Sequence, residues 1–303
     1  MHRKNLAVTF FLVVSSSVNS FAEATNTPTP GRLEPIVVTG RNTSVHDVTA
    51  ESDRVGPANQ PEWTTRRAFA ETDIYVIPPG EIELNQFYVL SHPREGKAEH
   101  AFETEIEIGL PWRTQLDVEP NYSIEGGNFR YDSTRIEVPH ALANWGKIPF
   151  NPAVDAGWRF NNGEADSFLL RLLLAEEFGE KWHLGGNFGF EQQVGGERET
   201  EYEINAALSY VAIDRKLSIG AELLAEFESD NEDERSTEVL LGPSILYKPT
   251  RDIHLGFVPL FGLTHDAPVA ELFFIVGIDL ESFPWKWGRQ ESSMETPTLR
   301  RPR

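Results

Sequence analysis

From about Glu81 to Leu280, apolar and polar residues alternate at nearly every step of the chain. Within residues 182–193, Trp182, Leu184 and Phe188 share one face, while His183 and Asn187 share the other, because successive side chains of a strand point to opposite sides. Such strands can separate lipid from a polar interior. About a dozen of them, each roughly ten residues long, predict an all-β fold, namely a transmembrane antiparallel up-and-down β-barrel of the bacterial outer membrane.

The predicted strands form an even set of about 12, as single-chain bacterial barrels require. They are residues 81–90, 100–109, 112–124, 130–145, 152–161, 166–177, 182–194, 199–211, 215–228, 236–248, 252–262 and 269–280. A soluble β-sandwich also has alternating strands, but it does not need its outer rows free of charge. The row at alternate positions of 202–210 contains only Tyr, Ile, Ala and Leu, which favours the barrel.

The chain is predicted to divide into a signal peptide (1–22), a flexible periplasmic extension (23–79), the barrel (80–281) and a C-terminal periplasmic tail (282–303). Arg3 and Lys4 precede an apolar run over 6–14 and a small-x-small cleavage site over 20–22. That run is shorter than the roughly 20 residues of a spanning helix, so export is preferred over a membrane anchor. Polar composition over 23–79 predicts the unfolded extension.

Orientation follows from the connections between the predicted strands. The shorter set, near 110–111, 146–150, 179–181, 212–214 and 249–251, matches the short periplasmic turns of this class. Both termini are therefore expected in the periplasm. The expected surroundings are outer-membrane lipid and lipopolysaccharide, and insertion would require the barrel-assembly machinery.

Composition excludes several kinds of chemistry. The chain has no cysteine, which removes disulfides and thiolate catalysis. Its formal charge of −20 argues against nucleic-acid partners. The acidic segment 230–234 lacks calcium-loop spacing, and the 8 histidines form no H-x-x-x-H pair, so the sequence predicts no metal site and no cofactor.

Several phrases resemble an uncharacterised family of proteobacterial outer-membrane β-barrels. They are residues 67–72, 79–81, 102–110, 114–116, 217–223, 242–243 and 259–264. The resemblance spans roughly Arg66 to Leu280 and implies fold and location. It carries no established substrate or catalytic residue.

A second, local resemblance is to the TonB box of TonB-dependent transporters. It comprises Glu34, Pro35, Ile36, Val37, Val38, Thr39 and Gly40. In those transporters this segment is captured as an added strand by the energising protein, which the resemblance implies as a possible partner. Those transporters have about 22 strands and a globular plug, which 12 strands and the stretch 41–79 do not match. An idle extended segment remains the alternative.

The inward positions of the predicted strands are rich in carboxylates. The candidate lumen-lining residues are Glu103, Glu105, Glu107, Asp117, Glu119, Asp155, Arg159, Arg171, Glu201, Glu203, Glu222, Glu226, Glu238, His254, Glu271 and Asp279. A water-filled lumen of this kind would concentrate cations. The leading hypothesis is a passive, narrow channel for small cationic or neutral solutes, without enzymatic activity.

Two alternatives stay open. Twelve strands enclose little space, and paired Glu and Arg side chains can fill it, so the barrel could be an occluded structural or binding protein whose extension engages a partner such as TonB. Some outer-membrane barrels are lipid hydrolases, and His140 with Ser133 or Thr134 would be the candidate site. None of these residues lies in a recognisable catalytic frame.

Overall fold

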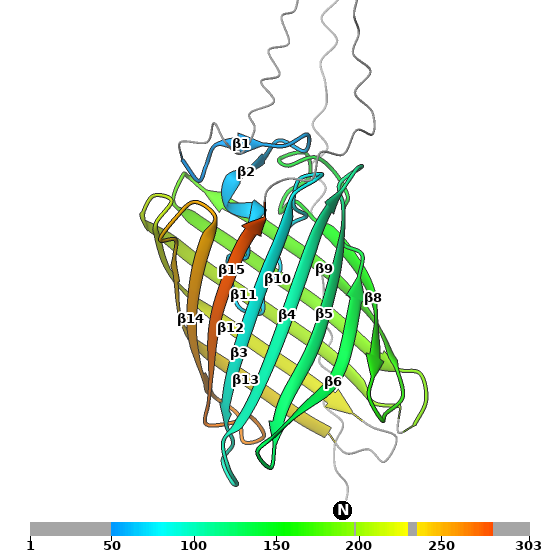
Figure 1. Ribbon diagram of the computed structural model, residues 1–303. Helices are drawn as coiled ribbons and strands as arrows, with labels where there is room; N and C mark the ends of the chain where they lie inside the picture. The colour runs from blue at the N-terminus through cyan, green and yellow to red at the C-terminus, as the bar shows by residue number, and fades with distance from the viewer. Residues whose placement is uncertain (1–49, 197, 230–234, 281–303) are drawn as a thin grey trace, which may run out of the picture. The chain divides into compact units, whose positions relative to one another are not determined.

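The computed structural model describes residues 50–196, 198–229 and 235–280. Its strands form a closed antiparallel barrel with 12 strand positions around the wall, one of which is shared by β6 and β7, as shown in Figure 1. The barrel strands are β3 (Ile82–His92), β4 (Glu99–Leu110), β5 (Thr114–Glu125), β6 (Asn128–Glu137), β7 (His140–Ala141), β8 (Ala153–Asn161), β9 (Ser167–Phe178), β10 (Trp182–Gln193), β11 (Thr200–Ile213), β12 (Leu217–Ser229), β13 (Arg235–Tyr247), β14 (Ile253–Gly262) and β15 (Ala270–Leu280). The predicted fold class is confirmed.

The first and last strands pair with each other and close the barrel. The register runs from Ile82 opposite Leu280 to His92 opposite Ala270. Closure is needed because hydrocarbon offers no partner to the backbone groups of a free strand edge. Within the described residues, no helix has the length and apolar character that a membrane-crossing helix needs.

One predicted strand, 130–145, is divided in the structure. Strands β6 and β7 both pair with β5 and β8, so together they occupy one strand position in the barrel. The break falls at Val138 and Pro139, where proline has no N–H to give to the ladder. Residues 142–152 then form a connection instead of continuing the strand.

The connections define two ends of the barrel. The turn end carries residues 111–113, 142–152, 179–181, 214–216 and 248–252, together with the start of β3 and the end of β15. The loop end carries the described connecting residues 93–98, 126–127, 162–166, 194–196, 198–199 and 263–269. Alternate connections therefore lie on opposite ends, as a meander requires.

The outer face of the barrel is apolar, with aromatic pairs near both ends. On β10 and β11, the ring centroids of Trp182 and Tyr210 lie 4.9 Å apart near the turn end. Those of Phe190 and Tyr202 lie 5.4 Å apart near the loop end. Between these pairs, outward residues such as Leu208 are exposed. An apolar exterior around a polar interior is the reverse of a water-soluble protein and is typical of a membrane barrel.

Residues 50–80, here called the plug, lie inside the turn end of the barrel. They contain the short strands β1 (Arg54–Val55) and β2 (Gln60–Pro61) and the 3-10 helix η2 (Glu62–Thr65), which Figure 1 shows at the top of the barrel. Trp63 and Phe69 are each 2% exposed. The prediction of a flexible extension is therefore wrong for residues 50–79, whereas residues 23–49 lie outside the described residues.

The physical reason for this error is the polarity of the surroundings. A polar segment is expected to stay unfolded when it has too little apolar surface to bury in a core of its own. Here the plug packs into the lumen, where side chains of the wall pair its polar groups and its apolar residues share a core with wall residues such as Leu173 and Ala207. Trp145 of the connection 142–152 also belongs to this interior, because it is 6% exposed and packs against the plug.

Candidate functional site: a plugged acidic lumen

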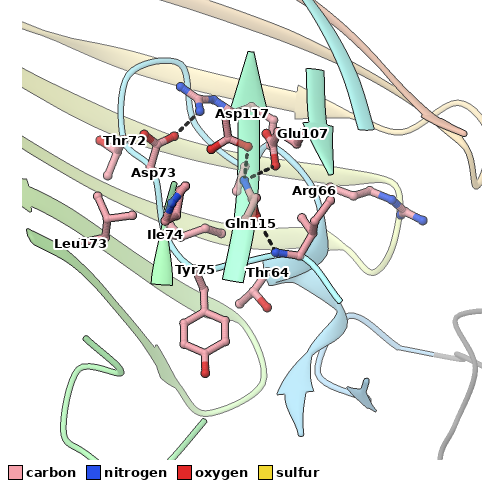
Figure 2. A pocket seen from close by; sticks show the side chains of 14 residues that line it. Thr64, Arg66, Thr72, Asp73, Ile74, Tyr75, Glu107, Gln115, Asp117 and Leu173 are labelled. Carbon is pink, nitrogen blue, oxygen red and sulfur yellow. Dashed lines mark hydrogen bonds and ion pairs between the residues drawn. The ribbon is translucent and has the colours of Figure 1, made fainter. Parts of the chain in front are cut away.

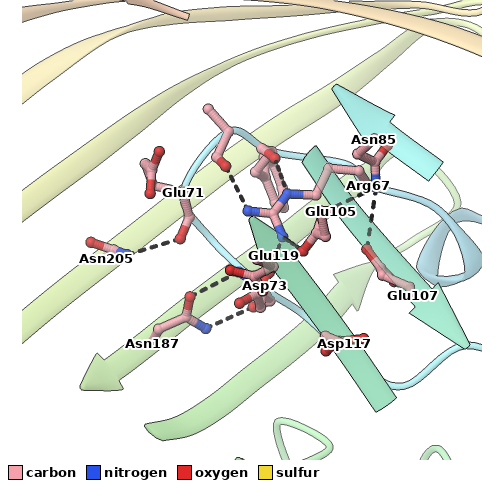
Figure 3. A network of polar contacts seen from close by, with 12 residues as sticks. Arg67, Glu71, Asp73, Asn85, Glu105, Glu107, Asp117, Glu119, Asn187 and Asn205 are labelled. Atoms are coloured by element: carbon pink, nitrogen blue, oxygen red, sulfur yellow. Dashed lines mark hydrogen bonds and ion pairs between the residues drawn. The ribbon is translucent and has the colours of Figure 1, made fainter. Parts of the chain in front are cut away.

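Arg67 is the central cation of the plug. Its guanidinium contacts the carboxylate of Asp73 and lies 3.2 Å from Oε1 of Glu105 on β4. It also donates to the carbonyl oxygens of Phe69 and Ala70, at 2.9 and 2.6 Å. Figure 3 shows Arg67 between the plug loop and β4. One side chain therefore closes the loop 67–73 and ties it to the barrel wall.

Asp73 ties the same loop to the opposite wall. Its Oδ2 lies 2.6 Å from Nη1 of Arg171 on β9. Its backbone N–H donates to Asn187 of β10 at 2.8 Å, and the amide of Asn187 donates back to the Asp73 carbonyl at 2.7 Å. Burial would raise the pKa of Asp73, but the guanidiniums of Arg67 and Arg171 outweigh it and hold that pKa below its usual value.

Polar side chains of the wall also satisfy the plug backbone, which has little secondary structure of its own. Glu222 accepts from the N–H of Ala70 at 2.9 Å, and Asn205 donates to the carbonyl of Glu71 at 2.9 Å. Gln115 accepts from the N–H of Ile77 at 2.7 Å. Figure 2 shows Gln115 beside the plug. These bonds answer the requirement that buried backbone groups be paired.

Nearer the turn end, the contacts between plug and barrel become aromatic. The rings of Trp63 and His183 stack with centroids 4.1 Å apart, and Trp145 meets Trp63 edge-on at 6.0 Å. Tyr75 packs edge-on against Trp145 at 5.3 Å and donates its hydroxyl to the carbonyl of Ala143 at 2.6 Å. Burial raises the pKa of Tyr75 to about 12. This layer seals the turn end.

Three cavities described beside the plug and the inner wall are small. A cavity lined by Arg67, Asp73, Gln115 and neighbouring residues has a volume of about 20 Å³, and two others beside the plug or the inner wall have about 10 Å³ each. A water molecule needs roughly 10–15 Å³ measured this way. Each of these cavities is therefore about the size of a single water molecule, which is too small for a hydrated ion.

The predicted lumen-lining residues all occupy inward positions of their strands. Glu105, Glu107, Asp117, Glu119, Asp155, Glu222 and His254 are buried, and the others are partly buried. Arginines balance part of this charge: Arg171 lies 2.7 Å from Asp155, and Arg159 lies 2.8 Å from Glu191. Ion pairs therefore neutralise part of the carboxylate charge inside the barrel.

Towards the loop end, carboxylates stand opposite one another. We call Glu191, Glu201, Glu203, Glu226 and Glu238, on strands β10 to β13, the glutamate ladder. The cross-strand partners are Glu191 with Glu201, Glu203 with Glu226, and Glu226 with Glu238. Within the described part of the chain, no ion pair is found for Glu226 or Glu238.

Several residues of this site were not among the sequence candidates. Arg67 and Asp73 were missed because the plug was taken as unfolded. Arg135 and Glu137 of β6 lie 3.4 Å apart on the inner wall, and Glu83 and Asn85 of β3 are buried inside the barrel. The same alternation rule applied to the predicted strands 81–90 and 130–145 would have found these four.

The candidate hydrolase residues are not brought together. Nδ1 of His140 lies 3.0 Å from the hydroxyl of Thr114, its cross-strand partner. Ser133 lies on β6, which continues the line of β7, and is opposite Asn121 and Asn161. Within the described residues, the hydroxyl that His140 contacts is therefore that of Thr114 and not that of a serine nucleophile, which catalysis of this kind would require.

No protein family matches the chain, and no curated protein matches it, so neither sequence resemblance is confirmed. Among solved structures, an outer-membrane channel from Pseudomonas putida F1 is 10% identical, with a TM-score of 0.54, and the match covers 70% of this chain and 100% of that one. The NanC porin (12% identity, 67% and 98% coverage) and the KdgM porin (10%, 66% and 99%) both have a TM-score of 0.46. The likeness to the Pseudomonas putida channel agrees with the barrel fold of this chain.

Proposed function

We propose that this protein is an outer-membrane channel for small cationic or neutral solutes and that the plug closes it in the state described. Both termini would lie in the periplasm, at the turn end, among lipid and lipopolysaccharide after insertion by the barrel-assembly machinery. The observation that carries the proposal is the glutamate ladder. Directly opposed like charges destabilise a sheet, so such a row is a cost that cation attraction would explain.

The ladder lies between the plug and the loop end. Glu222 contacts the plug at Ala70, and Glu226 lies four residues further along β12, which is about 13 Å at the rise of a strand. Glu226 is within electrostatic range of Glu201, Glu203, Glu238 and Glu271. Solutes entering from the loop end would therefore meet a negative vestibule before they reach the plug.

Conduction through the barrel would require the plug to move. Many of its contacts with the wall are hydrogen bonds and ion pairs, such as those of Arg67 and Asp73, which water can replace once the plug leaves. The segment 34–40 lies outside the described residues, but only residues 41–49 separate it from the plug. Nine residues span at most about 30 Å, so a pull on that segment would reach the plug directly.

The second candidate function is an occluded binding barrel whose N-terminal segment engages a periplasmic partner such as TonB. The filled turn-end lumen favours it. A crosslink from Val37 or Val38 to that partner, lost on Val38→Pro, would support it, because proline removes the N–H needed for strand addition. A partner that still crosslinks to the Val38→Pro variant would argue against strand capture.

Conductance in a planar bilayer tests the channel. Three proteins should be compared: the mature full-length chain, a variant lacking residues 23–49, and a variant lacking residues 50–79. We expect discrete, cation-selective conductance only when the plug is deleted, while the 23–49 deletion should behave like the full-length chain. A silent bilayer with the plug deleted, in a barrel shown to be folded, would refute the channel.

A further inference from the structure

Three ionisable side chains meet inside the barrel at the seam where it closes. Glu83 of β3 and Asp279 of β15 are cross-strand partners, and His254 of β14 stands opposite Gly277 of β15. One potential ligand atom from each of the three side chains lies within 4.8 Å of the other two. Nε2 of His254 is 3.5 Å from Oε1 of Glu83.

His254 is buried without the hydrogen bonds that a buried imidazole requires. It is 1% exposed, and within the described residues neither ring nitrogen has a hydrogen-bond partner. Glu83 is also 1% exposed, and its Oε2 has no hydrogen-bond partner there either. Each buried polar group left in this way costs about 1–3 kcal/mol. Three such atoms in one cluster indicate a missing ligand.

The backbone makes room for the imidazole. A Cβ added to Gly277 would overlap the ring of His254 and would crowd the amide oxygen of Asn85. Only glycine therefore lets His254 lie across β15 towards Glu83.

The local charge also calls for a cation. Arg66 of the plug contacts Asp279 and lies 2.8 Å from Glu62, so three carboxylates, those of Glu62, Glu83 and Asp279, share one guanidinium. When all three carboxylates are ionised and the imidazole is neutral, the cluster carries two net negative charges. The neighbouring Lys248 lies 2.7 Å from Glu51. A divalent ion would neutralise the cluster.

We propose that Glu83, His254 and Asp279 bind a divalent transition-metal ion of the zinc type. An imidazole nitrogen together with carboxylate oxygens suits zinc and its neighbours, whereas calcium and magnesium take oxygen ligands alone. Ligands about 2.1 Å from a tetrahedral Zn²⁺ lie about 3.4 Å from one another. The distance of 3.5 Å between His254 and Glu83 matches this value, and the widest separation of 4.8 Å closes with small side-chain rotations.

The plug supplies the partners that orient two of the ligands. The backbone N–H of Arg67 donates to Oε1 of Glu83 at 3.0 Å, which holds that carboxylate in place, and Nε of Arg66 donates to Oδ2 of Asp279. Outer partners of this kind fix ligand geometry in metal sites. The ion would join the plug to the seam of β14, β15 and β3. The sequence has no metal motif here because the ligands lie on three strands that meet only on closure.

Metal binding to the full-length protein in detergent tests the proposal, whether or not the barrel conducts. The protein is treated with a chelator, and Zn²⁺ is then titrated against a chromophoric competitor. We expect one Zn²⁺ per chain, and at least tenfold weaker binding for His254→Ala and for Glu83→Gln. His265→Ala, at an exposed loop-end histidine, is the matched control and should bind like the parent.

A spectroscopic arm keeps the test decisive if a variant folds poorly. Co²⁺ bound to the unmodified protein should show the intense visible absorption of a tetrahedral nitrogen and oxygen site, and Zn²⁺ should displace it. No saturable binding by the parent would overturn the proposal. Equal loss of binding in His265→Ala, or no loss in a folded His254→Ala protein, would also overturn it, because the ion would then sit elsewhere.

Discussion

Replacing Arg67 with methionine should release the plug from the barrel. The side chain of Arg67 is 10% exposed, and that of Glu105 is 5% exposed, so the pair is shielded from water. Methionine keeps most of the aliphatic stem but leaves the carboxylates of Asp73 and Glu105 without this partner. Breaking a buried ion pair in this way costs about 3–5 kcal/mol. A free-energy change of 1.4 kcal/mol corresponds to a factor of ten. The population of undocked plug should therefore increase by a factor between about one hundred and a few thousand.

Cysteine labelling measures this population directly, because the natural chain has no cysteine. Thr72→Cys is a suitable reporter, since Thr72 is 1% exposed and its hydroxyl has no hydrogen-bond partner among the described residues. A water-soluble maleimide should react slowly with this cysteine in the parent and faster in Arg67→Met, in proportion to plug opening.

Arg94→Met is the matched control. Arg94 also donates to two carbonyl oxygens, those of Thr264 and Ala267, but it does so at the loop end, away from the plug. Its substitution should leave the labelling rate of the reporter unchanged. A labelling rate in Arg67→Met within about threefold of that of the parent would refute the assignment of Arg67 as a residue that holds the plug in place. Breaking a buried ion pair should cost more free energy than so small a change in rate implies.

Three further predictions rest on other parts of the structure. Trp63→Ala should weaken plug docking by about 3–5 kcal/mol, because the indole is 2% exposed, and the same labelling assay would detect it; an unchanged rate would contradict the aromatic seal. Gly277→Ala should lower Zn²⁺ affinity at least tenfold, because the new methyl group displaces the ring of His254, and competition titration would show it. Glu203→Gln with Glu226→Gln should reduce the cation selectivity of the plug-deleted barrel, measured as reversal potential in a salt gradient; the effect should fade as salt rises, and an unchanged potential would argue against the glutamate ladder.

The local pattern of the sequence was sufficient for the barrel wall. Alternation has a period of two residues and is written into each strand, so it predicted both the strands and which side chains face inward. The predicted 182–194 corresponds to β10 at Trp182–Gln193, and the predicted 252–262 corresponds to β14 at Ile253–Gly262. The one clear failure in the wall, at Val138 and Pro139, came from a proline that the pattern of polarity does not register.

The plug and the seam cluster were decided only by the tertiary structure. A polar segment such as residues 50–79 is expected to be unfolded in water but can be ordered inside a lumen whose polar side chains pair with it. The sequence of the segment does not specify which of these environments surrounds it. Arg67 meets Glu105, Asp73 meets Arg171, and Glu83 meets His254 across long stretches of chain. Such meetings depend on how the sheet closes. Sequence alternation therefore determined the barrel wall, whereas the closed tertiary structure determined how the plug and the seam cluster pack inside it. The reason is that local periodicity specifies the direction of a side chain but not its distant partner.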